Sequence, residues 1–310
     1  MSDIRIHNVS KSFGKIRAVR DVSLQIQHGE LFGLIGPDGA GKSTLIRLMS
    51  TLLLPDAGSI TLGDLDVVDD YKQLRRMIGY MPGKFSLYQD LSVEENLNFF
   101  ASVFGSSIEE NYDLVKDIYH QIEPFKKRRA GKLSGGMKQK LALSCALIHK
   151  PEFLFLDEPT TGVDAVSRVE FWNMLDKLKA QGITIFVSTP YMDEAMRCDR
   201  VALMQKGQIM AVDSPGNIPQ RFPKKLYAIQ ADDMYHLKVC LKRSGSVESV
   251  SLFGQTLHVI PSAGVSAKDI ESECRQQGFE NMTCKAIKPG IEDVFIELMS
   301  KQNKEQDEDR

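Results

Sequence analysis

The segment GPDGAGKST, residues 36–44, decides the fold of this chain. It fits the pattern G-x-x-x-x-G-K-[ST], whose glycines let the backbone wrap around an anion and point N–H groups at it. The apolar run before it, residues 30–35, has the length of a strand, and residues 45–54 repeat apolar side chains at helical spacing. A strand, a glycine-rich loop and a helix in this order indicate a phosphate-binding loop.

This loop predicts which residues contact a bound nucleotide. Lys42 would reach the β- and γ-phosphates, and the Ser43 hydroxyl would hold Mg²⁺. The positive end of the following helix adds to the attraction for phosphate. We therefore expect a nucleotide-binding protein, with binding residues at Gly36, Pro37, Asp38, Gly39, Ala40, Gly41, Lys42, Ser43 and Thr44.

Length and composition narrow the class of protein. A chain of 310 residues is long enough for two domains and a sizeable core. A hydrophobic content of 42% and a charged content of 26% are typical of a soluble globular protein. The formal net charge of -2 gives no reason to expect nucleic acid or an anionic membrane surface as a partner. The basic cluster at residues 126–129 is typical of a solvated helix end.

The sequence also lacks the usual membrane and disulfide signals. Its first residues contain no apolar segment of the kind found in signal peptides. No stretch approaches the roughly 18 apolar residues needed to span a bilayer, so we expect membrane association only through a partner. The five cysteines are irregularly spaced and form no C-x-x-C pair, which is typical of free thiols in a reducing cytoplasm.

Strands and helices alternate through the first two thirds of the chain. Residues 153–156 form an apolar run that suits a strand buried on both faces of a parallel sheet. A helix over 167–180, a strand over 183–187, a helix over 192–197 and a strand over 200–204 continue the alternation. This order predicts an α/β fold with a mostly parallel sheet.

Two carboxylates, Asp157 and Glu158, close the strand at residues 153–156. One interpretation is a structural cap for the next element. With a phosphate loop upstream, they could instead divide the chemistry of phosphoryl transfer. Asp157 would hold Mg²⁺ through water and Ser43, and Glu158 would orient or activate the water that attacks the γ-phosphate. On this second interpretation Glu158 and Lys42 are the catalytic residues.

The character of the sequence changes near residues 215–223, where prolines and glycines mark a boundary. Beyond it the pattern predicts the order βαββαβ of a split-βαβ, ferredoxin-like unit, followed by a helix over 291–300. We expect the polar tail, residues 301–310, to be disordered. The predicted organisation is a nucleotide-binding domain over 1–215 with a helical subdomain at about 85–150, a small α+β accessory domain over 216–300, and the tail.

Five sequence features occur in the order seen in ATP-binding-cassette (ABC) ATPases, which this chain resembles over roughly residues 2–215. They are the phosphate loop at 36–44, LSGGMKQK at 133–140, FLFLDEP at 153–159, TTGVDA at 160–165 and VSTPYMDEA at 187–195. LSGG between the other two motifs is nearly diagnostic of the family. The ending IKPGIEDVFIELMSK, residues 287–301, is similar to the tail of ABC-2-type exporter ATPases, the group that contains drug-resistance and lipid exporters.

The resemblance implies an ABC-type P-loop ATPase core that binds ATP and Mg²⁺ and pairs head to tail with a second such domain. In that pairing Ser134, Gly135 and Gly136 contact the ATP held by the partner, aided by the dipole of a helix expected over residues 137–149. Asp164 matches the loop that crosses the dimer seam. Phe13, which the residues alone leave open as a core residue or a platform for a flat base, matches the adenine-stacking position.

This chain departs from the family's pattern at two positions. The family usually has Gln at the position of Gly83, where it binds Mg²⁺ or the attacking water. It usually has His at the position of Pro190, where it contacts the γ-phosphate. Neither glycine nor proline has a side chain that forms hydrogen bonds. Because losing one preorganised polar contact to the transition state costs about 10²–10³ in rate, the site on this chain's own phosphate loop is expected to be slow.

We therefore expect the ATPase subunit of an exporter, cytoplasmic and peripheral on the inner face of the cell membrane, docked on a separate permease near residues 83–89. Its LSGG segment would serve a sister ATPase in a heterodimer. A homodimer that tolerates both changes is an alternative, since Glu158 is retained. A further alternative is a non-hydrolysing, nucleotide-dependent regulatory subunit of the same assembly.

Overall fold

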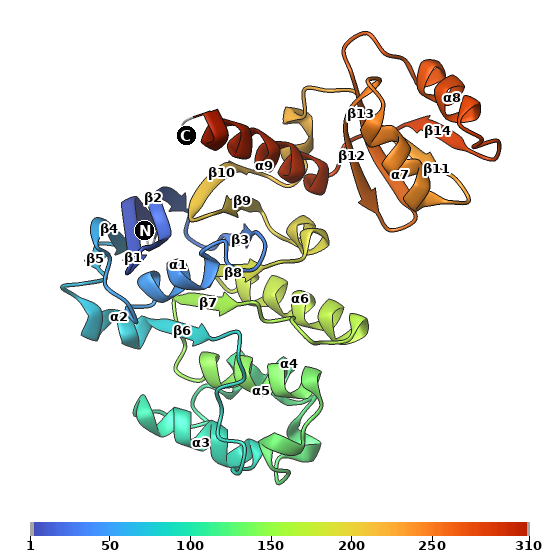
Figure 1. Ribbon diagram of the computed structural model, residues 1–310. Coiled ribbons are helices and arrows are strands. Elements are labelled where there is room, and N and C mark those ends of the chain that lie inside the picture. Colours follow the sequence, from blue (N-terminus) through green and yellow to red (C-terminus); the bar gives the residue numbers. More distant parts are fainter. Residues whose placement is uncertain (1–2, 309–310) are drawn as a thin grey trace. The chain divides into compact units, whose positions relative to one another are not determined.

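The computed structural model describes residues 3–308, with side chains as far as Gln302. Its chain divides into two compact units, Met1–Pro215 and Gly216–Arg310, which are described separately below (Figure 1). The prediction of an α/β fold with a mostly parallel sheet is confirmed for the first unit.

The first unit is built on a sheet of six strands within the described residues, in the order β10-β9-β3-β8-β7-β6. All neighbours pair in parallel except β10 and β9, which form an antiparallel hairpin. The central strands are buried along their whole length because helices and a second sheet cover both faces. The strands are β3 (Leu31–Ile35), β6 (Ile78–Met81), β7 (Phe153–Asp157), β8 (Thr184–Thr189), β9 (Arg200–Gln205) and β10 (Gln208–Asp213).

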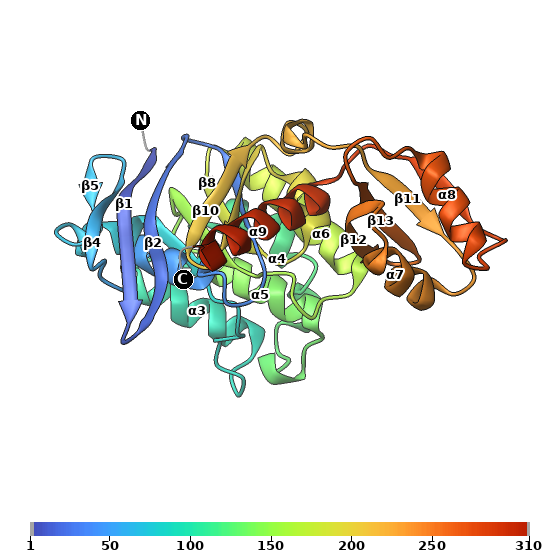
Figure 2. The same cartoon turned by 45° about the horizontal axis from the view of Figure 1, so that its top comes forward.

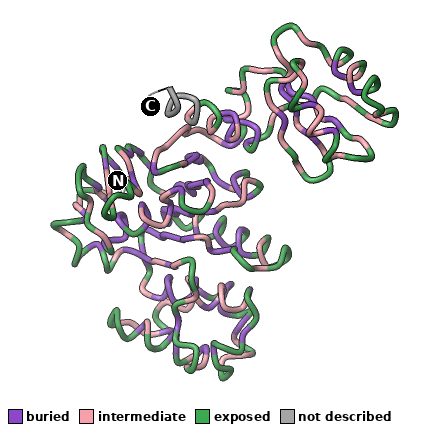
Figure 3. The backbone as a smooth tube through the Cα atoms, viewed as in Figure 1, coloured by how far each residue is buried: buried purple, intermediate pink, exposed green. Residues whose placement is uncertain are grey.

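A second, antiparallel sheet lies beside the first in both ribbon views (Figures 1 and 2). Its order is β2-β1-β4-β5, formed by β1 (Ile4–Phe13), β2 (Ile16–Ile26), β4 (Ala57–Leu62) and β5 (Leu65–Asp66). Its inward side chains share one hydrophobic core with the parallel sheet and the helix α1 (Lys42–Met49). Figure 3 shows these buried residues concentrated along the strands.

The helices of this unit fall into two groups. Helices α1, α2 (Tyr71–Met77) and α6 (Ala165–Ala180) pack close to the sheets. Helices α3 (Val93–Val103), α4 (Tyr112–Tyr119) and α5 (Gly135–Leu147) form a separate cluster next to β6, with α5 packed against both of the others (Figure 1). Short 3₁₀ turns occupy η1 (Glu123–Phe125), η2 (Ala130–Lys132) and η3 (Met192–Arg197).

Two local predictions need correction, and one helix was not predicted. The helix expected over 137–149 begins at Gly135 because the Ser134 hydroxyl caps it by accepting a hydrogen bond from the Met137 N–H. The segment Met192–Arg197, expected as an α-helix, is a 3₁₀ turn, the form that short helical pieces between strands often take. The helix α2 was not foreseen, since its seven residues carry a single buried side chain, Leu74.

The second unit, Gly216–Arg310, contains the sheet β12-β13-β11-β14 with every neighbouring pair antiparallel. With its two helices this is the βαββαβ order of a split-βαβ, ferredoxin-like unit, as predicted. A short turn η4 (Ile218–Arg221) precedes the sheet. The remaining elements are β11 (Tyr227–Gln230), α7 (Met234–Arg243), β12 (Val247–Phe253), β13 (Thr256–Pro261), α8 (Ala267–Gln276) and β14 (Thr283–Ala286).

The last helix, α9 (Ile291–Glu308), extends further than expected. The tail from residue 301 was expected to be disordered, but residues 301–308 continue the helix. Its first turns are anchored by buried Val294 and Phe295, and the polar residues that follow are mostly good helix formers, so the helix propagates through them. The part of this expectation that concerns residues 309–310 lies outside the described residues.

Candidate nucleotide-binding site

The predicted phosphate loop joins the end of β3 to the start of α1, as the motif requires. At two of its positions only glycine fits, because a side chain would collide with neighbouring backbone. A Cβ added at Gly36 would lie 2.3 Å from the Met204 carbonyl oxygen, and one at Gly41 would lie 2.3 Å from the Ala18 carbonyl oxygen. Gly41 also has a φ of 108°, a backbone conformation that residues other than glycine rarely adopt. The loop conformation therefore depends on glycine at both positions.

Lys42 is a buried cation at the start of α1, with its side chain 3% exposed. Its ammonium donates hydrogen bonds to the carbonyls of Gly36 at 2.8 Å and Pro37 at 3.0 Å. It also forms an ion pair with Glu158, with Nζ 3.0 Å from Oε1. Oxygen atoms of the protein thus surround the ammonium, and phosphate oxygens of a nucleotide could replace them without leaving the charge unpaired.

Asp157 and Ser43 meet at the base of the loop, as the sequence analysis expected. The Ser43 hydroxyl donates to Asp157 Oδ1 at 3.0 Å, and Asp157 is 3% exposed. The same oxygen accepts a second hydrogen bond, of 2.8 Å, from the hydroxyl of Ser188. A hydroxyl and a carboxylate in contact are oxygen donors of the kind that Mg²⁺ prefers, so these residues fit a magnesium ion bound beside the phosphates.

Glu158 projects from a strained backbone position next to Asp157. Its φ of 49° is left-handed, which is uncommon for a residue with a side chain. Its N–H is held by Ser188, through both the carbonyl at 3.1 Å and the hydroxyl at 3.0 Å. The carboxylate, 22% exposed, is thereby held toward Lys42. Ser188 positions both carboxylates. It was not predicted, because a serine near the end of an apolar strand carries no signal of its own.

A cavity of about 570 Å³ opens over the loop. Its walls carry basic residues that were not among the predicted site residues: Lys15, Arg17, Arg20 and Lys206. Together with Lys42 they make an environment suited to a polyphosphate. The only hint in the sequence was that Lys15, Arg17 and Arg20 follow Phe13 closely. Lys15 lies in the hairpin that joins β1 to β2, and the two arginines lie in the first residues of β2.

Phe13 stands at the end of β1 in that same hairpin. Its side chain is 48% exposed, so it is not a core residue. Its cross-strand partner Ile16 lines the cavity, whereas Phe13 itself lies beside the lining. An exposed aromatic ring next to a nucleotide-sized cavity is compatible with stacking on a base.

The LSGG segment lies at the start of α5 and packs against the start of α6. A Cβ on Gly136 would lie 2.5 Å from the Ser167 hydroxyl, and one on Gly135 would lie 3.3 Å from the Gly162 carbonyl oxygen. Asp164 caps α6 by accepting a hydrogen bond of 3.0 Å from the Ser167 N–H. None of Ser134, Gly135, Gly136 and Asp164 is among the described residues that line the nucleotide cavity. The structure therefore groups them with one another and not with the phosphate loop of the same chain.

The two positions that depart from the ABC pattern both lie near the carboxylates. A Cβ on Gly83 would be 3.0 Å from the Asp157 carbonyl oxygen and 3.8 Å from Asp157 Oδ2. Pro190 directly follows Thr189, whose carbonyl accepts a hydrogen bond from the Gly36 N–H. At both places the chain approaches the site with a residue that offers no polar side-chain group.

Comparison with known proteins agrees with this arrangement. The profile of the family described as "ABC transporter" matches residues 19–161. The chain is 38% identical over 288 residues to the "Probable multidrug ABC transporter ATP-binding protein YbhF" of Escherichia coli, which covers 91% of this chain and 49% of that protein. This chain therefore spans about half the length of that relative. It is also 34% identical to the "Nod factor export ATP-binding protein I" of a Rhizobium species, over 96% of this chain and 97% of that protein.

Solved structures give the same result. A structure titled "Structure of ATP binding subunit of ABC transporter" superposes with a TM-score of 0.64 at 27% identity, covering 71% of this chain and 92% of that one. The dimeric post-hydrolysis ATP-binding cassette MJ0796, bound to ADP and Pi, has a TM-score of 0.62 at 26% identity, covering 68% of this chain and 98% of that one. By its sequence, its fold and the geometry of its phosphate loop, the chain belongs to the ATP-binding proteins of the ABC transporter family.

Proposed function

We propose that this chain is the ATP-binding and ATP-hydrolysing subunit of an exporter, driving transport through a separate membrane permease. The observation that carries the proposal is the pair of contacts at the phosphate loop: Lys42 lies 3.0 Å from Glu158, and Ser43 lies 3.0 Å from Asp157. Phosphoryl transfer needs positioned charge and an oriented water more than covalent chemistry, and these groups supply both.

Each residue then has a defined task. The N–H groups of residues 36–44 and the Lys42 ammonium hold the β- and γ-phosphates. Ser43 and Asp157 hold the Mg²⁺ ion, which neutralises phosphate charge. Glu158 leaves its ion pair with Lys42 when phosphate arrives and becomes available to orient the attacking water. The exposed ring of Phe13 stacks on the adenine.

The same site is proposed to turn over slowly. Gly83 lies against Asp157, where a polar side chain could reach the metal or the water, and Pro190 lies at the next strand end. Each missing contact costs about 10²–10³ in rate. A weakly active site is compatible with ATP binding, because the loop and Lys42 are complete.

The second half of the proposal concerns the partner. The LSGG segment keeps the family's motif unchanged. Ser134 caps α5, and Gly136 packs closely against Ser167. Ser134, Gly135 and Gly136 therefore serve the ATP of a sister ATPase whose own His and Gln are present. The result is a heterodimer with one fast and one slow site. The alternative is a homodimer that relies on Glu158 alone at both sites.

The exporter assignment draws on the names of the relatives. One relative is named for multidrug transport and another for Nod factor export. No helix in the part of the chain that the structure describes is long and apolar enough to cross a membrane. A separate permease is therefore proposed to supply the transport path, with this chain bound to it at the inner face of the cell membrane.

A second candidate function is favoured by Gly83 and Pro190 themselves. A chain with two contacts missing could bind ATP to hold an assembly closed, as a non-hydrolysing regulatory subunit. Glu158→Gln distinguishes the two functions in cells. It abolishes transport if this site must turn over, and it leaves transport almost unchanged if the site only binds.

Purified protein tests the asymmetric pair directly. The chain alone should hydrolyse ATP well below transporter rates, which are on the order of 1–10 s⁻¹. With its sister ATPase, Ser134→Ala in this chain should abolish most turnover, whereas Glu158→Gln in this chain should change it little. A chain that works alone at ordinary rates, and that loses activity equally with either change, would establish the homodimer instead.

A further inference from the structure

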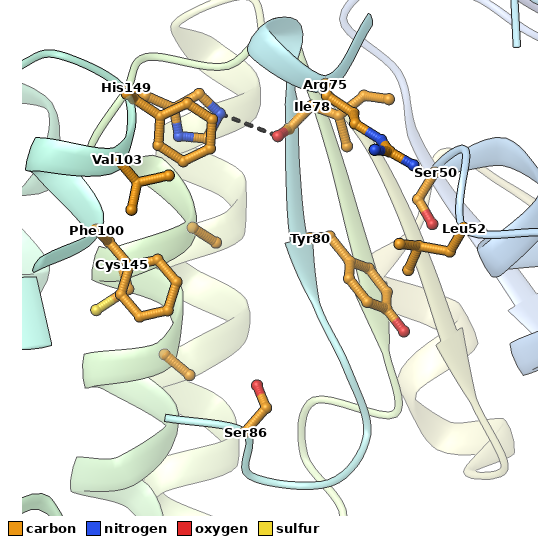
Figure 4. Close-up of a pocket in the computed structure, with 13 residues that line it drawn as sticks. Ser50, Leu52, Arg75, Ile78, Tyr80, Ser86, Phe100, Val103, Cys145 and His149 are labelled. Atoms are coloured by element: carbon orange, nitrogen blue, oxygen red, sulfur yellow. Dashed lines mark hydrogen bonds between the residues drawn. The ribbon is translucent and has the colours of Figure 1, made fainter. Parts of the chain in front are cut away.

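The first unit buries polar groups that have no direct part in the nucleotide site. One of them is His149, in a cavity of about 370 Å³ beside β6, where its Nε2–H donates a 2.9 Å hydrogen bond to the Ile78 carbonyl oxygen (Figure 4). This cavity shares none of the described residues that line the nucleotide cavity, and the contact joins His149 to a single strand. A buried carboxylate in η3, that of Glu194, instead joins three segments beside the nucleotide site.

Glu194 accepts hydrogen bonds from three side chains, and its own side chain is 3% exposed. Both of its carboxylate oxygens lie close to the Thr160 hydroxyl, Oε1 at 2.8 Å and Oε2 at 3.0 Å. Oε2 also accepts from the Thr189 hydroxyl at 2.6 Å, and Oε1 accepts from Arg168 Nε at 3.0 Å. A buried carboxylate is stable only where such donors replace water, so the loss of any one of these contacts is costly.

The three donors come from three segments next to the nucleotide site. Thr189 is the last residue of β8, and its carbonyl accepts a hydrogen bond from the Gly36 N–H of the phosphate loop. Arg168 lies near the start of α6. Thr160 lies in the loop between β7 and α6, two residues beyond Glu158. One buried side chain therefore fastens the end of β8, the start of α6 and the loop that carries Glu158.

Glu158 is the first residue of a tight turn in that loop. The turn is closed by a 3.2 Å hydrogen bond from the Thr161 N–H to the Glu158 carbonyl oxygen. Ser188 holds the start of the turn through the Glu158 N–H, and Glu194 holds its third residue, Thr160. A strained backbone, here with a φ of 49° at Glu158, persists only where the surrounding structure fixes it. The contacts of Ser188 and Glu194 fix this turn from both sides.

We propose that Glu194 is a positioning residue, which acts through Thr160 to hold the Glu158 carboxylate against Lys42. The inference rests on the proposed function, in which Glu158 leaves this ion pair and orients the attacking water. A firmly held carboxylate competes with phosphate for Lys42, and it stays close to the γ-phosphate once phosphate has displaced it. Loosening the turn should therefore strengthen ATP binding and slow hydrolysis together. A loss of stability alone would not strengthen ATP binding.

Thr160→Val tests this role, because valine keeps the branched shape of threonine and lacks its hydroxyl. The purified full chain is titrated with a fluorescent ATP analogue and Mg²⁺, and hydrolysis of ATP is followed in a single turnover with protein in excess. Thr160→Val should raise the affinity severalfold. It should lower turnover about 10- to 100-fold, since a small misplacement of a group that orients a reactant can cost about 10² in rate. Thr160→Ser, which keeps a hydroxyl, should restore both values.

Thr184→Val is the matched control for a loss of stability. Thr184 is the first residue of β8 and is fully buried, and its hydroxyl accepts a 3.0 Å hydrogen bond from the Gly29 N–H. This change should lower the midpoint of chemical denaturation, as Thr160→Val does, and leave ATP affinity and turnover unchanged. Glu194→Gln should act in the same direction as Thr160→Val, because one amide oxygen cannot accept from all three donors. If Glu194→Gln does not fold, Thr160→Val still decides the question.

A double-mutant cycle shows whether Thr160 acts through Glu158. When Glu158→Gln is already present, Thr160→Val should not change ATP affinity further, because the carboxylate that pairs with Lys42 has been removed. If the two effects add, Thr160 acts on the phosphate loop by another route and the positioning role is wrong. It is also wrong if Thr160→Val and Thr184→Val have the same ATP affinity and turnover.

The two readouts separate this inference from the proposed function. If wild type hydrolyses ATP no faster than Glu158→Gln, hydrolysis at this site is contradicted. A rise in affinity with Thr160→Val that is absent in the Glu158→Gln background would still establish that Glu194 holds Glu158. If wild type hydrolyses ATP faster than Glu158→Gln, and Thr160→Val matches wild type in affinity and turnover, the proposed function stands and the positioning role is overturned.

Discussion

The Lys42 ammonium lies 3.0 Å from the Glu158 carboxylate, so the residue expected to hold phosphate is paired with the residue expected to orient water. The same ammonium contacts two loop carbonyls. A nucleotide entering the site must therefore exchange phosphate oxygens for the Glu158 carboxylate around Lys42. On the proposed function, binding of ATP and release of Glu158 are one event.

Glu158→Gln should strengthen ATP binding while it lowers hydrolysis. The neutral amide competes less well than phosphate for Lys42, so the affinity for a fluorescent ATP analogue should rise severalfold. Loss of the water-orienting carboxylate should lower turnover at the site on this chain's own phosphate loop by about 10²–10³, although the total turnover of a pair with a sister ATPase should change little. Glu170→Gln is a matched control, because Glu170 pairs with Lys140 at a distance of 2.6 Å and its side chain is 46% exposed. Equal effects of the two substitutions would contradict the role given to Glu158.

Ser188→Ala should loosen both carboxylates at once. The hydroxyl donates to Asp157 and accepts from the Glu158 N–H, and it is fully buried. Removing it should lower the free energy of unfolding by about 1–2 kcal/mol, measured by chemical denaturation. It should also weaken the Mg²⁺ dependence of ATP binding, since Asp157 loses a partner that fixes its orientation. Ser102→Ala, which removes an exposed hydroxyl bonded within its own helix, should do neither.

Ser188 also illustrates what the sequence could not predict. The phosphate loop was predictable because only glycine fits beside the Met204 and Ala18 carbonyls. This requirement fixes glycine at Gly36 and Gly41, and the spacing of the two is visible in the sequence. Asp157 and Glu158 were predictable as charged residues at the end of a buried strand. Ser188 becomes meaningful only when β8 is known to lie beside β7, and a single sequence does not reveal strand order. Residues that act through a neighbouring strand are therefore missed.

Element boundaries failed for local reasons. The start of α5 at Gly135 depends on the hydroxyl of Ser134, which turns two glycines into the first turn of a helix. The extension of α9 beyond residue 300 depends on packed turns upstream, which a window of polar residues does not show. In both cases a cap or upstream packing sets the boundary, and local composition shows neither. The βαββαβ order of the second unit was predictable because the spacing of its apolar residues differs clearly between the strand segments and the helix segments.

Restoring the two missing side chains should accelerate this chain's own site. Gly83→Gln places a Cβ 3.0 Å from the Asp157 carbonyl, close enough that a shift of a few tenths of an ångström accommodates it. Pro190→His returns a polar ring at the end of β8. Paired with a sister ATPase whose LSGG segment is intact, the double variant should raise turnover at this site by about 10² or more, because each contact is worth about 10²–10³.

The readout requires that the sister site be silenced by changing its own catalytic glutamate. Turnover that remains then comes from the phosphate loop of this chain. Gly83→Ala serves as a control, because it adds the same Cβ near Asp157 without a polar group. A double variant no faster than Gly83→Ala would show that the slow site has another cause.

His149 should make the fold less stable in mild acid. Burial lowers its pKa below the usual 6.5, so the unfolded chain binds this proton before the folded chain does. The stabilisation from a neutral ring is therefore complete above pH 6.5 and declines as the pH falls below that value. His149→Gln keeps a donor for the Ile78 carbonyl and removes the titration. The difference in unfolding free energy between wild type and this variant should shrink or reverse between pH 7 and pH 5. His7→Gln, on an exposed residue, should track wild type throughout.

Gly136→Ala should damage the half-site that is proposed to serve a sister ATPase. The new methyl group would lie 2.5 Å from the Ser167 hydroxyl, so Ser167 must move, and the Asp164 cap that binds the Ser167 N–H moves with it. Overpacking of this kind costs about 1–3 kcal/mol of stability. Activity of the sister site should fall, while ATP affinity at this chain's own loop should stay unchanged, because Gly136 lies outside the described lining of that cavity.

A compensating change tests whether that contact is the cause. Ser167→Gly removes the clashing atoms and should return stability and sister-site activity to Gly136→Ala, since the N–H that binds Asp164 is kept. Gly135→Ala is the matched control, as its methyl group would meet only the Gly162 carbonyl at 3.3 Å and should cost much less. If Ser167→Gly restores stability but not activity, Gly136 contacts the partner's nucleotide itself. If it restores both, Gly136 acts by allowing α5 and α6 to approach closely.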